Sequence, residues 1–306
     1  MRALRKMHEG PGLELVEIPV PEPGWGQVLI RVQATGLCGT DLHLFNWDGG
    51  APGSLEPPMT LGHEFFGVIE KLGPGVPHGE EPGDLHVGQQ VSVEGHVVCG
   101  RCRNCRAGRK HMCVRSKGIG VNRDGAFADY VVVPAENVWV QPDLIDAELG
   151  ALFDPFGNAV HVSQQAELTG ADVLITGAGP IGIMCVALAK HAGARHIVVT
   201  DLNDSRLELA LAAGADAAIK PGLSGLEEVM ADLGITEGFD VGLEMSGAAP
   251  AMRDLIETCN HGATLVLLGL PSEAFAVDWR KIITHMLTIK GVYGREMFDT
   301  WYLATF

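Results

Sequence analysis

Hydrophobic and polar positions follow two different patterns in the two halves of the chain. In the first half, short runs of alternating apolar and polar residues are separated by turn residues, and they cover Gln27–Val32, Phe66–Leu72, Gln90–Val93 and Asp129–Val133. A period of two between turns predicts half-buried β-strands. The polar stretch His78–Asp84 predicts a surface loop among them.

From about Ala171 onward, apolar runs alternate with segments of helical periodicity. The expected strands are Asp172–Thr176, His196–Thr200, Ala217–Ile219, Phe239–Glu244, Thr264–Leu268 and Thr288–Val292. Helical patterns between them include Ile181–Ala192 and Ser205–Ala213. Apolar strands that alternate with helices predict a parallel sheet covered on both faces. Six such strands fit the doubly wound dinucleotide-binding fold, so we expect an α/β protein whose first half is mainly β.

Length and charge narrow the class of protein further. A chain of 306 residues is long for a single core and predicts two domains. The net charge of −16 argues against nucleic acid or an anionic membrane as partner, and it suits small metabolites or simply keeps the chain soluble. The basic start MRALRK has no apolar stretch behind it, and no run reaches the roughly 18–20 apolar residues of a membrane span. We therefore expect a cytoplasmic protein.

The seven cysteines need an explanation other than disulfides in a reducing cytosol. Four of them, Cys99, Cys102, Cys105 and Cys113, have the spacing C-x2-C-x2-C-x7-C, which predicts a closed tetrahedral zinc site of structural type. Basic residues around them would offset the charge of four thiolates. An iron–sulfur cluster and a nucleic-acid-binding zinc ribbon are the alternatives for this lobe. Cys185 and Cys259 lie in helical apolar patterns and are expected to be buried thiols.

Three further segments carry candidate chemistry: GLCGTDLH at 36–43, GHEFFG at 62–67 and FDPFGNAVH at 153–161. A catalytic zinc takes few protein ligands and keeps a position open for substrate. Cys38 and His63 offer a thiolate and an imidazole, and Glu64 and Asp154 offer carboxylates nearby. Each residue alone would be ordinary, as a buried thiol or a structural histidine. Their joint occurrence with a four-cysteine site and a nucleotide fold favours a metal centre.

Thr40 and His43 follow Cys38 and lie one helical turn apart. A hydroxyl and an imidazole so placed can pass a proton from a bound alcohol to solvent. Alternatively, Thr40 caps a helix and His43 is merely exposed.

The segment DVLITGAGPIG at 172–182 contains Gly177, Gly179 and Gly182 as G-x-G-x-x-G, after an apolar strand and at the start of a helix. In this context, the glycines allow a tight turn, backbone approach to a pyrophosphate and close helix packing. Asp201 ends the next strand, where a carboxylate accepts hydrogen bonds from the ribose hydroxyls and favours NAD over NADP. Arg206 is compatible with NAD or NADP, since it can stack on adenine or hold a 2′-phosphate. The alternative for Asp201 is that it only caps the next helix.

Taken together, GHE, the four-cysteine lobe and GAGPIG resemble the zinc-containing medium-chain alcohol dehydrogenases. The match runs over nearly the entire chain, and FDPFGNAVH and GREMFDTWY (294–302) are most similar to the branch that oxidises L-threonine. The resemblance implies a GroES-like mainly-β catalytic domain and a Rossmann domain, two Zn²⁺ per subunit, NAD as cofactor and a homotetramer. It implies oxidation of L-threonine at C3 to L-2-amino-3-oxobutanoate, a step in threonine breakdown to glycine.

The resemblance also implies roles for particular residues. The catalytic zinc ligands would be Cys38, His63 and Glu64, and the structural ones the four lobe cysteines. Asp154 would assist proton transfer or coordination, and Thr40 and His43 would form the proton relay. NAD would contact the three glycines together with Ile181, Asp201, Arg206, Leu268, Gly269, Leu270, Val292 and Tyr293.

These assignments predict a catalytic domain over 1–155, with the zinc lobe at about 95–115, and an NAD-binding domain over 156–298. Residues 299–306 would begin a return to the catalytic domain that the family completes with a further helix and strands. Two other functions stay open: a polyol or butanediol dehydrogenase, and a chain that binds zinc and NAD without turnover. A zinc-free quinone reductase conflicts with Cys38 and His63.

Overall fold

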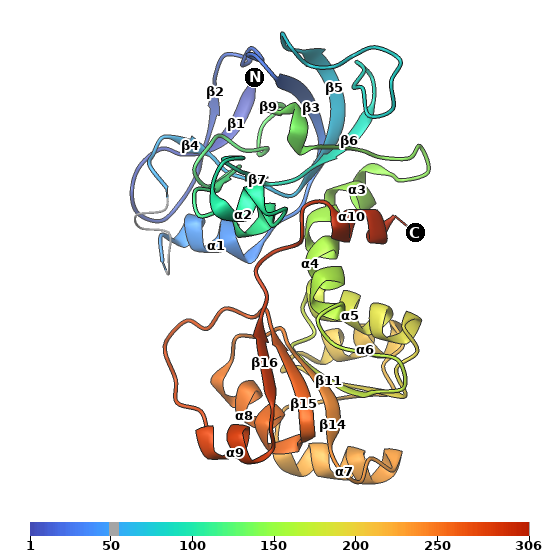
Figure 1. Cartoon of the computed structure of the whole chain (residues 1–306). Coiled ribbons are helices and arrows are strands. Elements are labelled where there is room, and N and C mark those ends of the chain that lie inside the picture. Colours follow the sequence, from blue (N-terminus) through green and yellow to red (C-terminus); the bar gives the residue numbers. More distant parts are fainter. Residues whose placement is uncertain (49–54, 306) are drawn as a thin grey trace. The chain divides into compact units, whose positions relative to one another are not determined.

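The computed structural model describes residues 1–48 and 55–305, which form two compact units, Met1–Asp154 and Pro155–Phe306 (Figure 1). The domain limits expected from the sequence, after residues 155 and 298, remain predictions. Residues 49–54 of the expected catalytic domain and Phe306 at the end of the expected return segment lie outside the described residues. Among the described residues, no helix is both long and apolar enough to cross a bilayer.

The first unit is built mainly from antiparallel strands. A five-stranded sheet has the order β10-β6-β5-β3-β9, and a three-stranded sheet has the order β2-β1-β4. The bounds are β1 Arg2–Lys6, β2 Glu14–Glu17, β3 Gln27–Thr35, β4 Met59–Thr60, β5 Phe65–Leu72, β6 Gln90–Val93, β7 His96–Val97, β8 Lys117–Gly118, β9 Tyr130–Pro134 and β10 Val138–Val140. The four strands expected from period-two alternation correspond to β3, β5, β6 and β9.

The core of the first unit comes from the inward-facing positions of these strands. Val28 and Ile30 of β3, Ile69 of β5, and Val131 and Val133 of β9 are all buried in one cluster. Residues two apart point to the same face of a strand, so the alternation in the sequence directly produces this apolar face. The prediction of a mainly β first half is confirmed.

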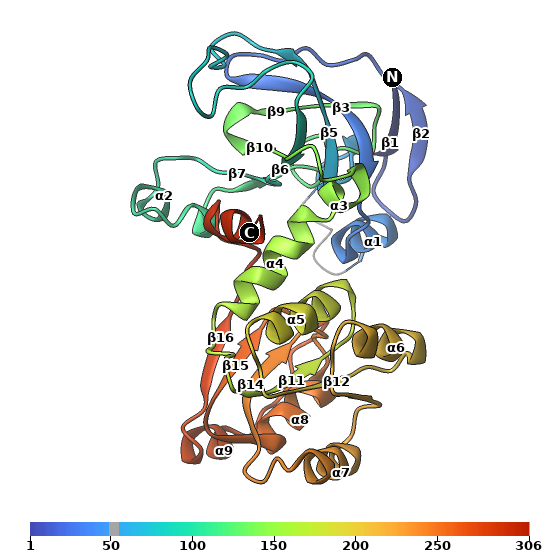
Figure 2. The ribbon, with the colours of Figure 1, turned by 90° about the vertical axis from the view of Figure 1, so that its right-hand side faces the viewer.

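The second unit contains a six-stranded parallel sheet with the order β13-β12-β11-β14-β15-β16 (Figure 2). The strands are β11 Asp172–Thr176, β12 His196–Thr200, β13 Ala217–Ile219, β14 Phe239–Glu244, β15 Cys259–Leu267 and β16 Thr288–Gly291. The order reverses between β11 and β14, as in a doubly wound sheet. The predicted fold is therefore confirmed.

Burial on both faces explains why β11 is apolar at consecutive positions. Val173 and Ile175 join the cluster that contains Cys185 and Val186 of helix α5. Leu174, which points the opposite way, belongs to a second cluster with Leu255 of helix α8. A strand covered by helices on both faces needs apolar side chains throughout.

The helices follow the expected alternation with the strands. They are α1 Gly39–Asn46, α2 Arg103–Arg106, α3 Ala147–Ala151, α4 Phe153–Ser163, α5 Pro180–His191, α6 Asp204–Ala212, α7 Leu223–Leu233, α8 Ala249–Thr258, α9 Trp279–Thr284 and α10 Asp299–Ala304, with short 3₁₀ turns at Lys110–Met112 and Ala135–Asn137. Cys185 and Cys259 are both buried, and burial raises the pKa of each thiol to about 12. The predicted helical placement of Cys259 is wrong, because this residue follows the last residue of α8 as its C-cap and begins β15.

Candidate active site and metal centres

The four lobe cysteines come together in the first unit around the short helix α2. Their sulfur atoms all lie within 4.8 Å of one another. Individual Sγ–Sγ distances are 3.4 Å for Cys102 and Cys105, 3.6 Å for Cys99 and Cys113, and 4.0 Å for Cys102 and Cys113. A zinc ion bound by four thiolates at about 2.3 Å requires sulfur atoms about 3.8 Å apart, so this cluster has the dimensions of a tetrahedral zinc site.

Backbone N–H groups favour the thiolate form of part of this cluster, whereas burial raises the pKa of Cys105 to about 12. The pKa of Cys102 falls to about 6, chiefly because the backbone N–H of Cys105 donates to its sulfur. Cys113 Sγ accepts from the backbone N–H groups of Cys99 and Arg115, both at 3.4 Å. Such donors stabilise a thiolate, the form that binds metal.

Cys38, His63 and Glu64 form a second group, whose potential ligand atoms also lie within 4.8 Å of one another. Cys38 is the N-cap residue of α1, and His63 and Glu64 lie between β4 and β5. Thiolate, imidazole and carboxylate together suit zinc, and three protein ligands leave a coordination position free for substrate. The donor set therefore fits a catalytic zinc.

Asp41, which the sequence motifs do not single out, supports the candidate ligands Cys38 and His63. Its Oδ2 accepts a hydrogen bond from the backbone N–H of Cys38 at 3.0 Å, and its Oδ1 lies 3.5 Å from His63 Nδ1. Asp41 is only 4% exposed. With Nδ1 turned toward this carboxylate, Nε2 of His63 is left to face a metal, as is usual for histidine ligands. The signal in the sequence was an acid three residues after the helix N-cap, the spacing of a capping box.

Electrostatics at this group call for a cation. Burial by itself would lower the pKa of His63, but Asp41, Cys38 and Asp154 outweigh it and raise the pKa to about 11. Burial raises the pKa of Glu64 to about 7, with a further contribution from Asp154. The raised pKa values of His63 and Glu64 both show that this group favours positive charge, which a divalent cation would supply.

Close packing fixes the Glu64 carboxylate against the backbone of the loop before Cys38. The N–H of Gly36 donates to the carbonyl oxygen of Glu64 at 2.8 Å, and a Cβ atom on Gly36 would come within 2.5 Å of Glu64 Oε2. A larger residue at position 36 would push the Glu64 carboxylate out of this position. Asp154, in the first turn of α4, is 6% exposed and completes the acidic environment of His63 and Glu64.

The predicted proton relay is only partly assembled. Thr40 Oγ1 lies 3.8 Å from Cys38 Sγ, and Thr40 follows the N-cap rather than being the cap itself. The His43 side chain is 63% exposed, and its Nδ1 lies 2.5 Å from Asp48 Oδ1. Within residues 1–48 and 55–305, no hydrogen bond joins Thr40 directly to His43. Thr40 thus adjoins the ligand group, and His43 reaches solvent.

The glycine-rich segment has the geometry expected of a nucleotide-binding turn. Gly177 has a positive φ of 95°, and a Cβ on Gly182 would come within 2.0 Å of the carbonyl oxygen of Gly177. Gly179 is the N-cap of α5, and the space that its Cβ would occupy is open. The turn and the start of α5, including Ile181, lie at the carboxyl end of β11, where an open sheet of this kind binds its ligand.

Asp201 follows β12 and holds this turn from one side. Its Oδ2 accepts from the backbone N–H of Ala178 at 2.8 Å, and Arg206 Nη1 lies 3.9 Å from the same oxygen. Helix α6 is capped by Asn203, so Asp201 is not its N-cap. The remaining predicted contact residues follow other strands at the same edge of the sheet: Leu268, Gly269 and Leu270 after β15, and Val292 and Tyr293 after β16.

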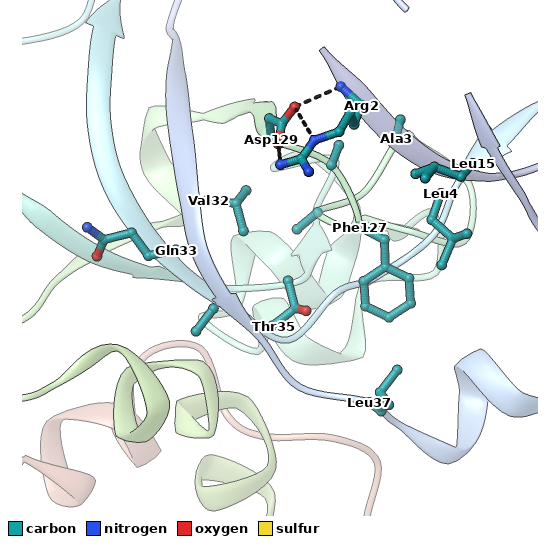
Figure 3. A pocket seen from close by; sticks show the side chains of 13 residues that line it. Arg2, Ala3, Leu4, Leu15, Val32, Gln33, Thr35, Leu37, Phe127 and Asp129 are labelled. Atoms are coloured by element: carbon teal, nitrogen blue, oxygen red, sulfur yellow. Dashed lines mark hydrogen bonds and ion pairs between the residues drawn. The ribbon is translucent and has the colours of Figure 1, made fainter. Parts of the chain in front are cut away.

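The first unit also contains a pocket of about 520 Å³ between β1, β3 and residues 126–129 (Figure 3). Leu4, Leu15, Leu37 and Phe127 give it an apolar wall, and Arg2 and Asp129 form an ion pair at 2.9 Å on its rim. None of the predicted ligand or relay residues lines it. The candidate ligands are therefore not part of its wall, although Leu37, which precedes Cys38, is.

The first unit is mainly β and has two groups of potential metal ligands, and the second is doubly wound and has a nucleotide-binding turn. Together these features define a zinc- and dinucleotide-dependent dehydrogenase. Residues 24–143 match the family model of the alcohol dehydrogenase GroES-like domain, and residues 180–305 match that of zinc-binding dehydrogenases. The chain belongs to the zinc-binding medium-chain dehydrogenase family. This membership confirms the predicted class of enzyme, which uses zinc and NAD(P).

Known proteins resemble the chain over almost its full length. It is 52% identical to an L-threonine 3-dehydrogenase of Chromobacterium violaceum, over 99% of this chain and 87% of the relative. It is 53% identical to an L-threonine 3-dehydrogenase of Streptomyces avermitilis, over 99% and 86%. Among solved structures, a protein from Sinorhizobium meliloti described as a zinc-binding dehydrogenase and bound to NADP gives a TM-score of 0.89 at 30% identity, over 99% of this chain and 88% of the other.

Proposed function

We propose that the chain oxidises L-threonine at C3 with NAD, giving L-2-amino-3-oxobutanoate and NADH. The observation that carries the proposal is the group of Cys38, His63 and Glu64 beside Asp154 in a chain about half identical to L-threonine 3-dehydrogenases. This group has the ligands of an open zinc site, and its surroundings are acidic enough to favour the ammonium group of an amino-acid substrate.

In this proposal, Cys38, His63 and Glu64 hold the catalytic zinc, and Asp41 orients His63. A zinc ion at this position supplies a Lewis acid for the substrate hydroxyl oxygen. Thr40, beside Cys38, takes up the hydroxyl proton and gives up its own in the same step, and the exposed His43 passes that proton to solvent, although no hydrogen bond among the described residues joins the two side chains directly. Asp154 keeps the centre negative and assists that proton transfer. Cys99, Cys102, Cys105 and Cys113 hold a second, structural zinc.

The nucleotide turn and the strand ends beside it bind the cofactor. Gly177, Gly179 and Gly182 accommodate the pyrophosphate, and Asp201 accepts hydrogen bonds from the adenosine ribose. A carboxylate at that place repels a 2′-phosphate, which is why we propose NAD, although the similar Sinorhizobium meliloti protein holds NADP. Cofactor contacts also come from Ile181, Arg206, Leu268, Gly269, Leu270, Val292 and Tyr293.

Assembly and location are part of the same proposal. We expect a homotetramer in the cytoplasm, with 1–155 as the catalytic domain and 156–298 as the NAD-binding domain. Size-exclusion chromatography with light scattering measures the subunit number directly.

The decisive experiment is NADH formation by the purified, zinc-loaded chain with L-threonine, compared with L-serine, sorbitol and 2,3-butanediol. We expect a clear preference for L-threonine, loss of turnover in His63→Ala, and unchanged turnover in His8→Ala, whose side chain is 82% exposed. Preference for a polyol or for butanediol would reassign the substrate. A folded chain that holds zinc and NAD but turns over none of these alcohols would contradict the proposal.

A further inference from the structure

Glu244, the last residue of β14, is a buried carboxylate to which the proposed function gives no role. It is 4% exposed, and four donors converge on its oxygens. The backbone N–H groups of Ser246 and Gly247 donate at 2.9 and 3.0 Å, the Thr176 hydroxyl lies at 3.4 Å, and the Ser246 hydroxyl also donates. Gly247 N–H reaches both oxygens, since Oε2 lies at 3.0 Å as well.

Within the described residues, the Glu244 carboxyl group has hydrogen bonds but no ion pair. In the part of the chain that the structure describes, no lysine, arginine or histidine forms an ion pair with Glu244. Removing a carboxylate from water is costly, and here only hydrogen bonds offset that cost. A glutamine or an apolar residue at this position would avoid the desolvation cost. The presence of a carboxyl group here therefore calls for an explanation.

The donors come from separate loops at one edge of the sheet. Thr176 ends β11 directly before the glycine turn, and Ser246 and Gly247 follow β14. The backbone oxygen of Glu244 accepts from Leu268 and Gly269 after β15, at 3.0 and 3.1 Å. Glu244 therefore links the loops that follow three adjacent strands.

These loops pack against one another with no spare space. A Cβ on Gly269 would come within 2.6 Å of Glu244 Oε2, and a Cβ on Gly177 would come within 3.0 Å of Ser246 Cβ. The Glu244 carboxylate thus lies beside the end of β15, and its partner Ser246 lies beside the glycine turn. Asp201 holds the same turn from the opposite side, through Ala178.

The linked loops lie at the point where the strand order reverses, between β11 and β14. In open α/β sheets, the ligand binds at this point, outside the carboxyl ends of the strands. Resting on the proposed use of NAD, we propose that Glu244 is a positioning residue. Its carboxylate binds the end of β11 and the loop after β14, while its backbone oxygen binds the loop after β15. The carboxylate thereby helps to fix the shape that receives the dinucleotide and sets the affinity for the cofactor.

The experiment compares Glu244→Gln with the wild type and with Glu167→Gln. Glu167 is an exposed carboxylate of the same unit that also accepts a backbone N–H, that of Thr169 at 3.1 Å, away from the carboxyl ends of the strands. Dissociation constants for NADH, NAD and ADP-ribose are measured by fluorescence and calorimetry, and chemical unfolding gives the stability of each ligand-free variant.

Glutamine keeps the shape of the side chain but turns one acceptor into a donor that faces Gly247 N–H. We expect Glu244→Gln to bind all three ligands about tenfold more weakly, by a common factor, and Glu167→Gln to bind them normally. Ser246→Ala removes one donor and leaves the carboxylate. It should weaken the binding of all three ligands by a common factor that is smaller than the factor for Glu244→Gln.

Unchanged dissociation constants for a folded Glu244→Gln would overturn the inference and leave Glu244 a purely structural residue. A loss confined to NAD, the only one of the three ligands with a cationic nicotinamide, would also overturn it, in favour of direct electrostatic attraction. Failure of the wild type to bind NADH would instead count against the proposed function, so the two failures are distinguishable.

Discussion

Gly157 of α4 lies directly against the indole of Trp301 in α10, so that a Cβ atom on Gly157 would come within 2.6 Å of Trp301 Nε1. The same Cβ would come within 2.9 Å of Cδ of Arg295, whose guanidinium lies 5.5 Å from the Trp301 ring centre. His161, one turn further along α4, has its Nδ1 2.9 Å from the carbonyl oxygen of Gly294. The segments FDPFGNAVH and GREMFDTWY, on which the resemblance to threonine-oxidising dehydrogenases depends most, are thus packing partners.

Replacing Gly157 with alanine should therefore destabilise the fold although alanine favours helices. We expect Gly157→Ala to lower the free energy of unfolding by about 1–3 kcal/mol, the usual cost of overpacking a tight site. Gly225→Ala in α7 is the matched control, because its nearest neighbour is the flexible end of Ile219 at 3.3 Å. The control should be neutral or more stable by up to about 1 kcal/mol. Urea unfolding measures both, and equal effects would contradict the packing argument.

The two metal sites should be separable by mutation. Cys38→Ser should remove one of two zinc ions per chain and abolish turnover with little effect on the melting temperature, because Cys38 holds an open, three-ligand site. Cys102→Ser should remove the other zinc and lower Tm by roughly 5–10 °C, because the lobe loses the ion that ties its loops together. Metal emission spectroscopy measures the zinc content per chain, and calorimetry measures the melting temperature. Retention of both zinc ions in either variant would rule out the corresponding ligand assignment.

Much of the fold follows from local patterns in the sequence. Strand β3 is predictable because burial of one face of a strand produces period-two alternation in its sequence. Strands β11 and β14 are predictable because burial of both faces requires an almost continuous apolar run. The placement of Cys259 failed because an apolar helix end and an apolar strand start have the same composition at a junction. In α8 and β15, the junction falls at Cys259.

The sequence predicts those parts of the candidate site whose residue types have few other functions in such a pattern. It does not predict the positions of side chains that depend on packing against distant segments. Four closely spaced cysteines or a glycine turn indicate their own chemistry. Lys6, in contrast, is fully buried, with Nζ 3.1 Å from the carbonyl oxygens of Gly12 and Phe45 and 5.1 Å from the Trp47 ring centre. The residues around Lys6 do not indicate that it is buried and binds the end of α1, whereas Lys71 is exposed.

Cofactor choice should depend on the charge of Asp201. Asp201 accepts the backbone N–H of Ala178 on one oxygen and that of Asn203 on the other, so Asp201→Asn can keep only one of these two hydrogen bonds. That loss affects both cofactors alike, whereas the repulsion of a 2′-phosphate disappears. We expect the affinity for NADPH relative to NADH to rise about tenfold or more. Asp204→Asn, an exposed carboxylate in the first turn of α6, should leave the ratio unchanged. Fluorescence titration with both reduced cofactors decides the matter, and an unchanged ratio in Asp201→Asn would assign the discrimination to another residue.

The pair His261 and His285 should make the second unit sensitive to mild acid. Their rings stack with centroids 4.1 Å apart and planes 18° apart. Burial, followed by the charges of His261 and Lys281, lowers the pKa of His285 below its usual value of 6.5, and Glu257 opposes this only weakly. Lys281 is itself paired with Glu257 at 2.5 Å.

A histidine whose pKa is lower in the folded chain than in the unfolded one binds its proton preferentially after unfolding. The stability that neutral His285 contributes is therefore present above about pH 6.5 and is lost as the pH falls through 6.5 toward the folded-state pKa. We expect the wild type to lose more unfolding free energy between about pH 7.5 and pH 5.5 than His285→Gln, which cannot titrate there. His191→Gln, at the exposed end of α5, should retain the full wild-type pH dependence. If His285→Gln and the wild type have the same slope in urea unfolding across this range, the stacked pair is not the acid-sensitive element.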